Sequence, residues 1–191
     1  MKHRSDLSVF FGALFLAALA GGCGTPLPEA EQSWRDQFEA NLERMGKHNW
    51  IVIAEAAYTS RYATGTRTVA TGKSLPSVLD SVLSEISDSK HVSATAWISS
   101  ELERIPDRDA PGITQFHKDI RRLLNTSKVE IKVVPEKEIV KKVEADAGTC
   151  NVLFLKSSSP LPYSSVYLQL DCRYWDEARE KRLRDALRSA E

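Results

Sequence analysis

The sequence predicts an α/β fold, in which short strands alternate with amphipathic helices. Apolar runs of strand length recur along the chain, and the segments between them carry apolar residues at helical spacing. Elements that alternate in this way pack as a layered sheet with helices on it. The chain has 191 residues, which is enough for one ordinary domain with a single core.

The first two elements are a helix and a buried strand. The helix is predicted over 29–44, and Gly46 is a fitting residue to end it. Its apolar side chains recur at helical spacing and are Trp34, Phe38 and Leu42. The next segment, 50–54, is apolar throughout and is bounded by polar residues. Such a run is typical of a strand that is buried on both faces.

The following elements continue the alternation. Strands are predicted over 66–70, 92–98 and 129–134, and helices over 76–86, 113–124 and 135–143. Pro76 and Pro135 stand at helix starts, where proline is favoured. The charged segment 101–111 contains proline and is predicted as a loop. A final helix starts at Asp176, with acidic residues in its first turn and arginines in its last, as the helix dipole favours.

Two further strands, 151–155 and 166–170, flank a connection rich in serine and proline. This pattern predicts a hairpin centred on Leu161, which would bring Cys150 and Cys172 opposite one another. In an oxidising compartment such an even pair is a candidate disulfide. The alternative is two buried thiols that behave as small apolar side chains.

The N-terminus has the features of a secretion signal. A basic start is followed by an apolar run over 9–19 and by small residues before Cys23. A cysteine at this point resembles the acylation site of a bacterial lipoprotein. A membrane-spanning anchor is the alternative, but the run is shorter than the roughly 20 residues that a spanning helix needs. We therefore expect a signal peptide over 1–22, a lipidated tether over 23–30 and a single domain over 31–191.

These features predict a protein of the bacterial cell envelope that faces the periplasm. Its contact with the bilayer would be the acylated Cys23, whose two or three acyl chains would give stable anchoring. The 26 basic and 26 acidic residues balance, and the sequence has no basic block with interleaved aromatic residues. Nucleic acid is therefore not an expected partner. No metal-binding cluster, phosphate loop or nucleophile motif occurs in the sequence, so we expect neither a metal nor another cofactor.

Two segments place polar residues beside predicted strands, where α/β folds build their sites. The first, 46–55, has the basic pair Lys47 and His48 before the strand and Glu55 after it. The second, 156–165, is the serine- and proline-rich connection. We take these segments as the candidate functional site.

Together the two segments resemble the family of D-ribose pyranases and L-fucose mutarotases (RbsD/FucU). Matching features are Gly46, the strand Ile51-Val52-Ile53-Ala54, the dipeptide Pro162-Tyr163 and the strand over 166–170. The order of the elements between them agrees as well. The resemblance implies a three-layer α/β/α sandwich on a mixed sheet. It also implies a monosaccharide as ligand and a homo-oligomeric ring with sites at the interfaces between subunits.

The chain departs from this family at most of its functional positions. Lys47 stands where the family has a catalytic histidine, and His48 follows one place later. The other replacements are Glu55 for an aspartate, Glu136 for a second histidine, Ser165 for an asparagine and Lys156 for an arginine. Tyr163 keeps the family's residue.

Mutarotation needs one group to protonate the ring oxygen of the sugar and another to take the proton of its anomeric hydroxyl. The resemblance therefore makes four residues the candidate catalytic groups: His48, Lys47, Glu55 and Tyr163. Glu136, Ser165 and Lys156 are the candidate sugar-binding groups. Two hypotheses stay open, namely a sugar-binding protein with residual mutarotase activity and a non-catalytic binding or scaffolding protein that kept the fold.

Overall fold

The computed structural model describes residues 33–59 and 64–189. In chain order its elements are α1 (Trp34–Leu42), β1 (Trp50–Ala54), β2 (Thr66–Ala70), α2 (Leu75–Asp88), β3 (Val92–Ser99), the 3₁₀ turn η1 (Leu102–Arg104), α3 (Ile113–Thr126), β4 (Glu130–Val134), α4 (Glu136–Ala147), β5 (Val152–Lys156), β6 (Val166–Cys172) and α5 (Glu177–Arg188). The predicted α/β class is confirmed. The strands over 50–54 and 66–70 have the predicted bounds.

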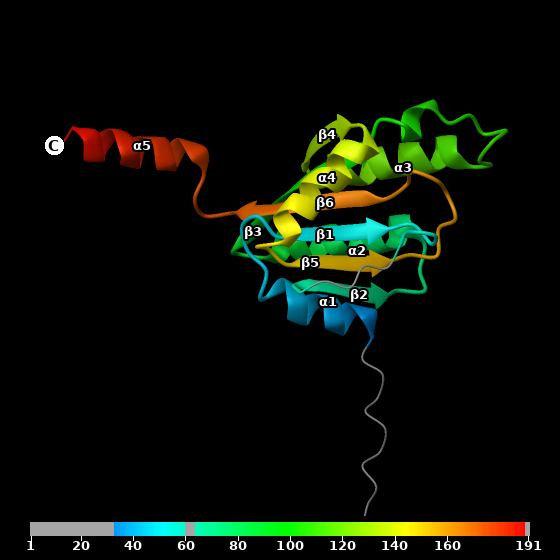
Figure 1. Ribbon diagram of the computed structural model, residues 1–191, viewed down its shortest axis with the longest axis horizontal. Coiled ribbons are helices and arrows are strands. Elements are labelled where there is room, and N and C mark those ends of the chain that lie inside the picture. The colour runs from blue at the N-terminus through cyan, green and yellow to red at the C-terminus, as the bar shows by residue number, and fades with distance from the viewer. Residues whose placement is uncertain (1–32, 60–63, 190–191) are drawn as a thin grey trace, which may run out of the picture. The chain divides into compact units, whose positions relative to one another are not determined.

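Six strands form one mixed sheet in the order β2-β5-β1-β6-β3-β4 (Figure 1). β2, β5 and β1 pair in parallel, as do β3 and β4. β6 runs antiparallel to its two neighbours, β1 and β3. The carboxyl ends of the parallel strands therefore meet the start of β6 at one edge of the sheet, which we call the carboxyl edge.

Helices cover both faces of this sheet, so the expected three layers are present (Figure 1). Because side chains alternate along a strand, the residues of β1 divide between two cores. Ile51 and Ile53 pack with α1, α2 and α3 on one face, in the larger core. Trp50 and Val52 pack with α4 on the other face, which we call the α4 face. Among the helices of residues 33–59 and 64–189, α4 alone covers the α4 face, and this leaves room there for cavities beside it.

Local signals in the sequence fix where several helices start. Ser33 accepts a hydrogen bond from the backbone N–H of Asp36, whose carboxylate accepts one from Ser33 in return. This reciprocal capping box starts α1. Pro76 lies in the first turn of α2, as predicted, where its missing N–H has no intrahelical partner. Gly112 precedes α3 with φ 87°, a conformation that favours glycine.

The predicted hairpin is wrong, and the disulfide prediction fails with it. β5 and β6 are not paired, because β1 lies between them in the sheet. Two steps between strands amount to roughly 9–10 Å, and a disulfide needs Cα atoms closer than about 7 Å. Cys150 and Cys172 are accordingly both free and partly exposed.

The C-terminal helix α5 buries none of its side chains. Its start agrees with the prediction, because Asp176 caps it by accepting a hydrogen bond from the N–H of Arg179. No helix within 33–59 and 64–189 is long and apolar enough to cross a membrane. The predicted signal peptide, Cys23 and the tether over 23–30 lie outside the described residues, as does the start of the helix predicted over 29–44.

Candidate functional site

Polar residues from four elements gather at the carboxyl edge. Glu55 follows β1, Glu101 follows β3, and Glu136 follows β4 as the first residue of α4. The loop over 157–165 joins β5 to β6 at the same edge. Sites of α/β folds lie at the carboxyl ends of parallel strands, because loops from several strands meet there.

Serine side chains hold the loop over 157–165 in place. The Ser157 hydroxyl donates to the carbonyl of Ala54 at 2.8 Å, and the Ser159 hydroxyl accepts from the N–H of Leu75 at 2.8 Å. The Ser164 hydroxyl donates to the carbonyl of Leu161 at 2.6 Å. All three serines are buried. The loop is therefore a firmly bonded platform, although its composition alone is typical of a flexible linker.

This platform presents Tyr163 in a strained conformation. Its φ of 56° lies in the left-handed region, which is uncommon for a bulky residue and costs on the order of 1 kcal/mol or more. The Tyr163 side chain is 40% exposed and lines a cavity together with Glu101 and Glu136. Strain of this kind concentrates at functional sites, where the surrounding structure holds it.

Glu55 is a half-buried carboxylate beneath this loop. Its Oε2 accepts a hydrogen bond from the backbone N–H of Ser164 at 3.3 Å, and its own N–H donates to the Ser165 hydroxyl at 3.2 Å. Burial raises the pKa of Glu55, and the hydrogen bonds from Ser164 and Tyr163 oppose this shift in part. The carboxyl group therefore stays available to accept or donate a proton at a higher pH than usual.

Glu136 is the second half-buried carboxylate, and Tyr167 fixes its orientation. The Tyr167 hydroxyl, from a fully buried side chain of β6, donates to Glu136 Oε1 at 3.0 Å. Burial raises the pKa of Glu136, and the charges of Glu55 and Glu101 raise it further, while the Tyr167 hydrogen bond lowers it. The charge of Glu55 thus influences the protonation of Glu136.

Glu101 has a structural task at the same edge. Its carboxylate accepts hydrogen bonds from the backbone N–H of Glu136 at 3.1 and 3.3 Å, so it caps the start of α4. The Ser99 hydroxyl donates to the same carboxylate at 2.6 Å, and this bond is the main cause that lowers the pKa of Glu101. Glu101 is therefore an ionised cap that positions Glu136.

Glu101, Glu136 and Tyr163 border a cavity of about 500 Å³ between the first turns of α4 and the loop that carries Tyr163, and Glu55 lies outside its lining. We call it the polar cavity; the side chains around it are those of Glu101, Glu136, Lys137, Val140, Lys141, Glu144 and Tyr163. Carboxylates, ammonium groups and a phenol can all hydrogen-bond the hydroxyl groups of a ligand. Within 33–59 and 64–189, no group of three or more His, Cys, Asp or Glu side chains is arranged to hold a metal ion.

Comparisons with known proteins identify the fold. No protein-family model matches the sequence, and no curated protein matches it. RbsD of Bacillus subtilis in complex with D-ribose matches in structure with a TM-score of 0.50 and 16% identity, over 71% of this chain and 91% of that one. The fucose mutarotase of Streptococcus pneumoniae in complex with L-fucose matches with a TM-score of 0.50 and 17% identity, over the same shares. The chain has an RbsD/FucU-like fold.

Within the RbsD/FucU-like fold, the predicted site residues divide between two edges of the sheet. Glu55, Glu136 and Tyr163 gather at the carboxyl edge, as expected. Lys47 and His48 precede β1 and lie at the opposite edge. Since β1 alone spans roughly 13 Å, His48 of one chain does not share a pocket with the Glu55 and Tyr163 of that chain.

The basic pair at the opposite edge has its own surroundings. Lys47 Nζ forms an ion pair with Asp171 at 3.3 Å, and both side chains are about half exposed. His48 is exposed, with φ 71°, and its backbone N–H donates to the carbonyl of Leu170 at 2.9 Å. A catalytic role for either residue would need a second copy of the chain to bring it to the carboxyl edge.

The other two predicted residues lie near the polar cavity without lining it. Ser165 is 1% exposed, and its hydroxyl is engaged by the N–H of Glu55, so it supports the site from beneath. Lys156 ends β5 on the α4 face and lies beside Tyr58 and Phe154. Neither side chain borders the cavity that Glu136 and Tyr163 share.

Sequence reasoning missed Tyr167, Tyr58 and Glu101. Glu101 follows a predicted strand just as Glu55 does, so its position after 92–98 is a signal that was overlooked. Tyr167 lies within an apolar strand, and only the pairing of β6 with β1 turns it toward α4. Tyr58 follows Glu55 closely in the chain, and its ring packs edge-on against Tyr167 at 6.4 Å.

Proposed function

We propose that this domain binds a monosaccharide in the polar cavity at its carboxyl edge. The observation that carries the proposal is the strained Tyr163 beside Glu136, a half-buried carboxylate oriented by Tyr167. Oriented carboxylates bind the hydroxyl groups of a sugar, and an exposed aromatic ring packs against its C–H faces. The presence of D-ribose and of L-fucose in the two structural neighbours supports the proposal.

We further propose that Glu55 and Glu136 supply the acid and the base for interconversion of anomers. Burial raises the pKa of both carboxyl groups, and the charge of Glu55 raises that of Glu136 further, so a proton stays on the pair to a higher pH than on ordinary carboxylates. The protonated carboxyl donates its proton to the ring oxygen, while the ionised one takes the proton of the anomeric hydroxyl. The bond between the anomeric carbon and the ring oxygen then breaks, a carbonyl forms, and the reverse steps close the ring on the other face.

The non-catalytic alternative also has an observation in its favour. In the part of the chain that the structure describes, no histidine lines the polar cavity, and His48 is exposed at the opposite edge. The other basic candidate, Lys47, is paired with Asp171 at that same opposite edge. A group whose ordinary pKa lies near neutrality is the usual choice for proton transfer. If Glu55 and Glu136 do not replace such a group, the domain binds a sugar without transforming it.

One experiment distinguishes a catalytic sugar-binding domain from a non-catalytic one. Saturation-transfer NMR on the Cys23→Ser protein would be run with ribose, fucose, glucose and galactose. Exchange between anomer signals above the buffer rate, abolished by Glu136→Gln, would support catalysis by the carboxylate pair. Binding without exchange would support a sugar receptor. If none of the four sugars bound, the proposed function would fail for them, and a scaffolding role would lead.

We propose that the domain is held at the bacterial envelope, on the periplasmic side, by an acylated Cys23. The basic start, the apolar run over 9–19 and the small residues before Cys23 support this. Cys23→Ser should move the protein from the membrane fraction to the soluble fraction. A variant that stays in the membranes would show that something other than the lipid holds it.

We also propose that the domain assembles as a homo-oligomer. The resemblance to a family of subunit rings supports this, and so does the α4 face, on which α4 is the one covering helix in the described part of the chain. Sedimentation velocity measurements on the Cys23→Ser protein should give a mass that is a multiple of the chain mass. A monomer over the whole micromolar range would contradict the proposal.

A further inference from the structure

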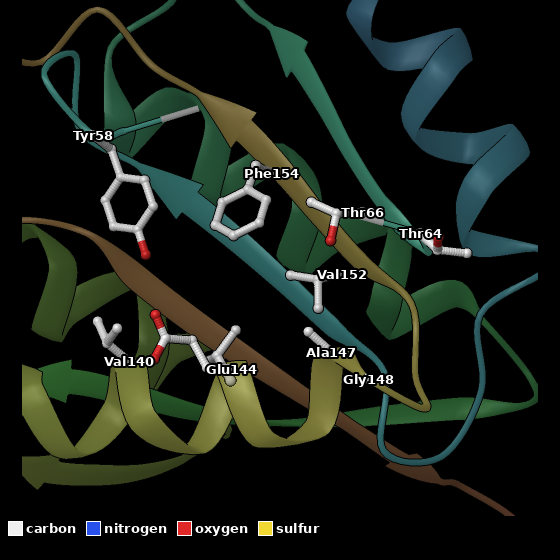
Figure 2. A pocket seen from close by; sticks show the side chains of 10 residues that line it. Tyr58, Thr64, Thr66, Val140, Glu144, Ala147, Gly148, Val152 and Phe154 are labelled. Carbon is white, nitrogen blue, oxygen red and sulfur yellow. The ribbon is translucent and has the colours of Figure 1, made fainter. Parts of the chain in front are cut away.

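A second cavity, of about 410 Å³, lies on the α4 face beside the polar cavity (Figure 2). It runs between α4 and the strands β2 and β5, and we call it the apolar groove. Its lining residues are Tyr58, Thr64, Thr66, Val140, Val143, Glu144, Ala147, Gly148, Val152 and Phe154. Its volume falls within the range of small-molecule sites.

The chemistry of the groove favours a neutral, apolar group. The rings of Tyr58 and Phe154 pack together, with centroids 5.5 Å apart, and form one wall with Val152. Of the ten residues that line the groove, Glu144 alone carries a charge. Figure 2 shows the Tyr58 hydroxyl and the Glu144 carboxylate pointing toward one another, while the other side-chain hydroxyls of the lining, those of Thr64 and Thr66, lie apart from this pair. The rest of the lining offers mainly apolar contact.

The groove and the polar cavity share a wall. Val140 and Glu144 line both spaces. Along α4, Glu136 faces the polar cavity, and Ala147, near the end of the helix, faces the groove. The helix rises about 16 Å between these two residues, so a single elongated small molecule can touch both spaces. The two spaces are therefore neighbours along α4, and this closeness guides the choice of occupant.

We propose that the natural ligand is a sugar that carries an apolar substituent, such as an alkyl, acyl or aryl group. The sugar ring lies in the polar cavity against Tyr163 and Glu136, and the substituent lies in the apolar groove. The inference rests on the proposed sugar binding and adds the class of sugar to it. A bare monosaccharide would leave the groove to water, which gains few hydrogen bonds from Val143, Val152 and Phe154.

Calorimetric titration of the Cys23→Ser protein tests this with matched ligands. The ligands are the methyl and hexyl glycosides of glucose, galactose and fucose, the C6 hexanoyl esters of glucose and galactose, and hexanol alone. We expect at least one hexyl or hexanoyl derivative to bind about tenfold or more tightly than its methyl or unsubstituted counterpart, since burial of a six-carbon chain is favourable. Hexanol alone should bind far more weakly than that derivative.

Two variants test whether the added affinity of the hexyl or hexanoyl derivative arises in the apolar groove. Ala147→Leu and Thr66→Leu each add bulk to opposite walls of the groove, and each should remove most of the gain while leaving the affinity for the bare sugar unchanged. Ala145→Leu is the matched control, because Ala145 is an exposed residue of the same helix and does not line the groove. This control should keep the full gain.

The outcomes separate failure of this inference from failure of the proposed function. If sugars bind but the hexyl and methyl forms bind equally, the groove inference is overturned and sugar binding stands. Equal binding of hexanol and hexyl glycoside would overturn it too, because the groove would then act independently of the sugar. If Ala147→Leu dissociated an oligomer, the groove would belong to a contact between subunits. If no sugar form bound at all, both proposals would fall.

Discussion

The Tyr167 hydroxyl donates a 3.0 Å hydrogen bond to the Glu136 carboxylate and so ties the buried strand β6 to the first turn of α4. Burial raises the pKa of this phenol far above its ordinary value of 10.0, so the hydroxyl keeps its proton throughout the physiological range. It can therefore act as a donor to Glu136 throughout this range. The orientation of Glu136 is set from within the protein, before any ligand arrives.

Tyr167→Phe tests the strength of this bond. The substitution leaves Glu136 half-buried without its donor, so we expect the free energy of unfolding to fall by about 1–2 kcal/mol in urea titrations at neutral pH. Tyr174→Phe is the matched control, because Tyr174 is 69% exposed, and its stability should equal that of the wild type. Equal stability of Tyr167→Phe and wild type would mean that water replaces the hydroxyl without cost.

The raised pKa of Glu136 predicts how stability depends on pH. Between the ordinary value of 4.5 and its raised pKa in the fold, Glu136 holds more proton in the folded state than in the unfolded state. Stability from this residue is therefore fully present below pH 4.5 and declines as the pH rises through the raised pKa. Glu136→Gln removes the titrating group and keeps an acceptor for Tyr167.

The measurement is the difference in unfolding free energy between Glu136→Gln and wild type, taken from about pH 4 to pH 8. We expect this difference to shift in favour of the variant as the pH rises. Glu138→Gln is the control, because Glu138 is an exposed residue of the same helix. A difference that stays constant across the range, or that moves in favour of the wild type, would contradict the raised pKa.

The fold could be predicted largely from periodicity. The strands over 50–54 and 66–70 and the starts of the helices followed from apolar spacing and from Pro76 and Pro135. Strand pairing could not be predicted in the same way. β5 and β6 are neighbours in the chain, yet β1 separates them, because pairing depends on long-range packing that no local pattern records. The helix predicted over 135–143 extends to Ala147, and Ala147 itself packs against the core of the α4 face, a tertiary contact that the charged segment before it does not predict.

The site shows the same division. Glu55 was predicted because it ends a strand, whereas Glu136 and Tyr163 were predicted because the resemblance to the RbsD/FucU family places them at functional positions. Lys47 and His48 were grouped with Glu55 because they are near it in sequence, but an extended strand separates residues as efficiently as the backbone allows. The role of Tyr167 depends on a contact between β6 and α4, so only the structure reveals it.

The positive φ of Tyr163 predicts that a glycine variant is more stable than an alanine variant at this position, the reverse of the usual order. At φ 56° glycine is favoured over any residue with a Cβ, so Tyr163→Gly should be more stable than Tyr163→Ala by about 1 kcal/mol. Both variants remove the ring and should weaken sugar binding in calorimetric titrations. Thermal unfolding of the two proteins checks the order.

Ser158 provides the control for Tyr163, because it is an exposed residue of the same loop whose φ is not positive. There the usual order should hold, with Ser158→Ala at least as stable as Ser158→Gly. If Tyr163→Ala proved the more stable of its pair, the loop would relax at no cost, and strain would not be a feature of this site.

The two cysteines should both react as thiols. Since β1 separates β5 from β6, Cys150 and Cys172 have no disulfide partner in one another. In the Cys23→Ser protein, unfolded without reductant and treated with iodoacetamide, the intact mass should show two adducts. The Cys150→Ser, Cys172→Ser double variant should keep the wild-type unfolding temperature. Absence of adducts would indicate a disulfide between Cys150 and Cys172, and the strands would then have to pair differently.

Lys47 and His48 provide a test of whether the site belongs to one chain or to two. The ion pair between Lys47 and Asp171 is half exposed, so Lys47→Ala should cost less than about 1 kcal/mol of stability. With both residues at the far end of β1 from Glu55, Lys47→Ala and His48→Ala should leave sugar affinity unchanged if the polar cavity of one chain suffices. Glu55→Ala should weaken sugar affinity.

Loss of affinity in Lys47→Ala without loss of stability would mean that a second copy brings its own opposite edge to this cavity. Sugar binding would then depend on protein concentration in the same way as assembly does.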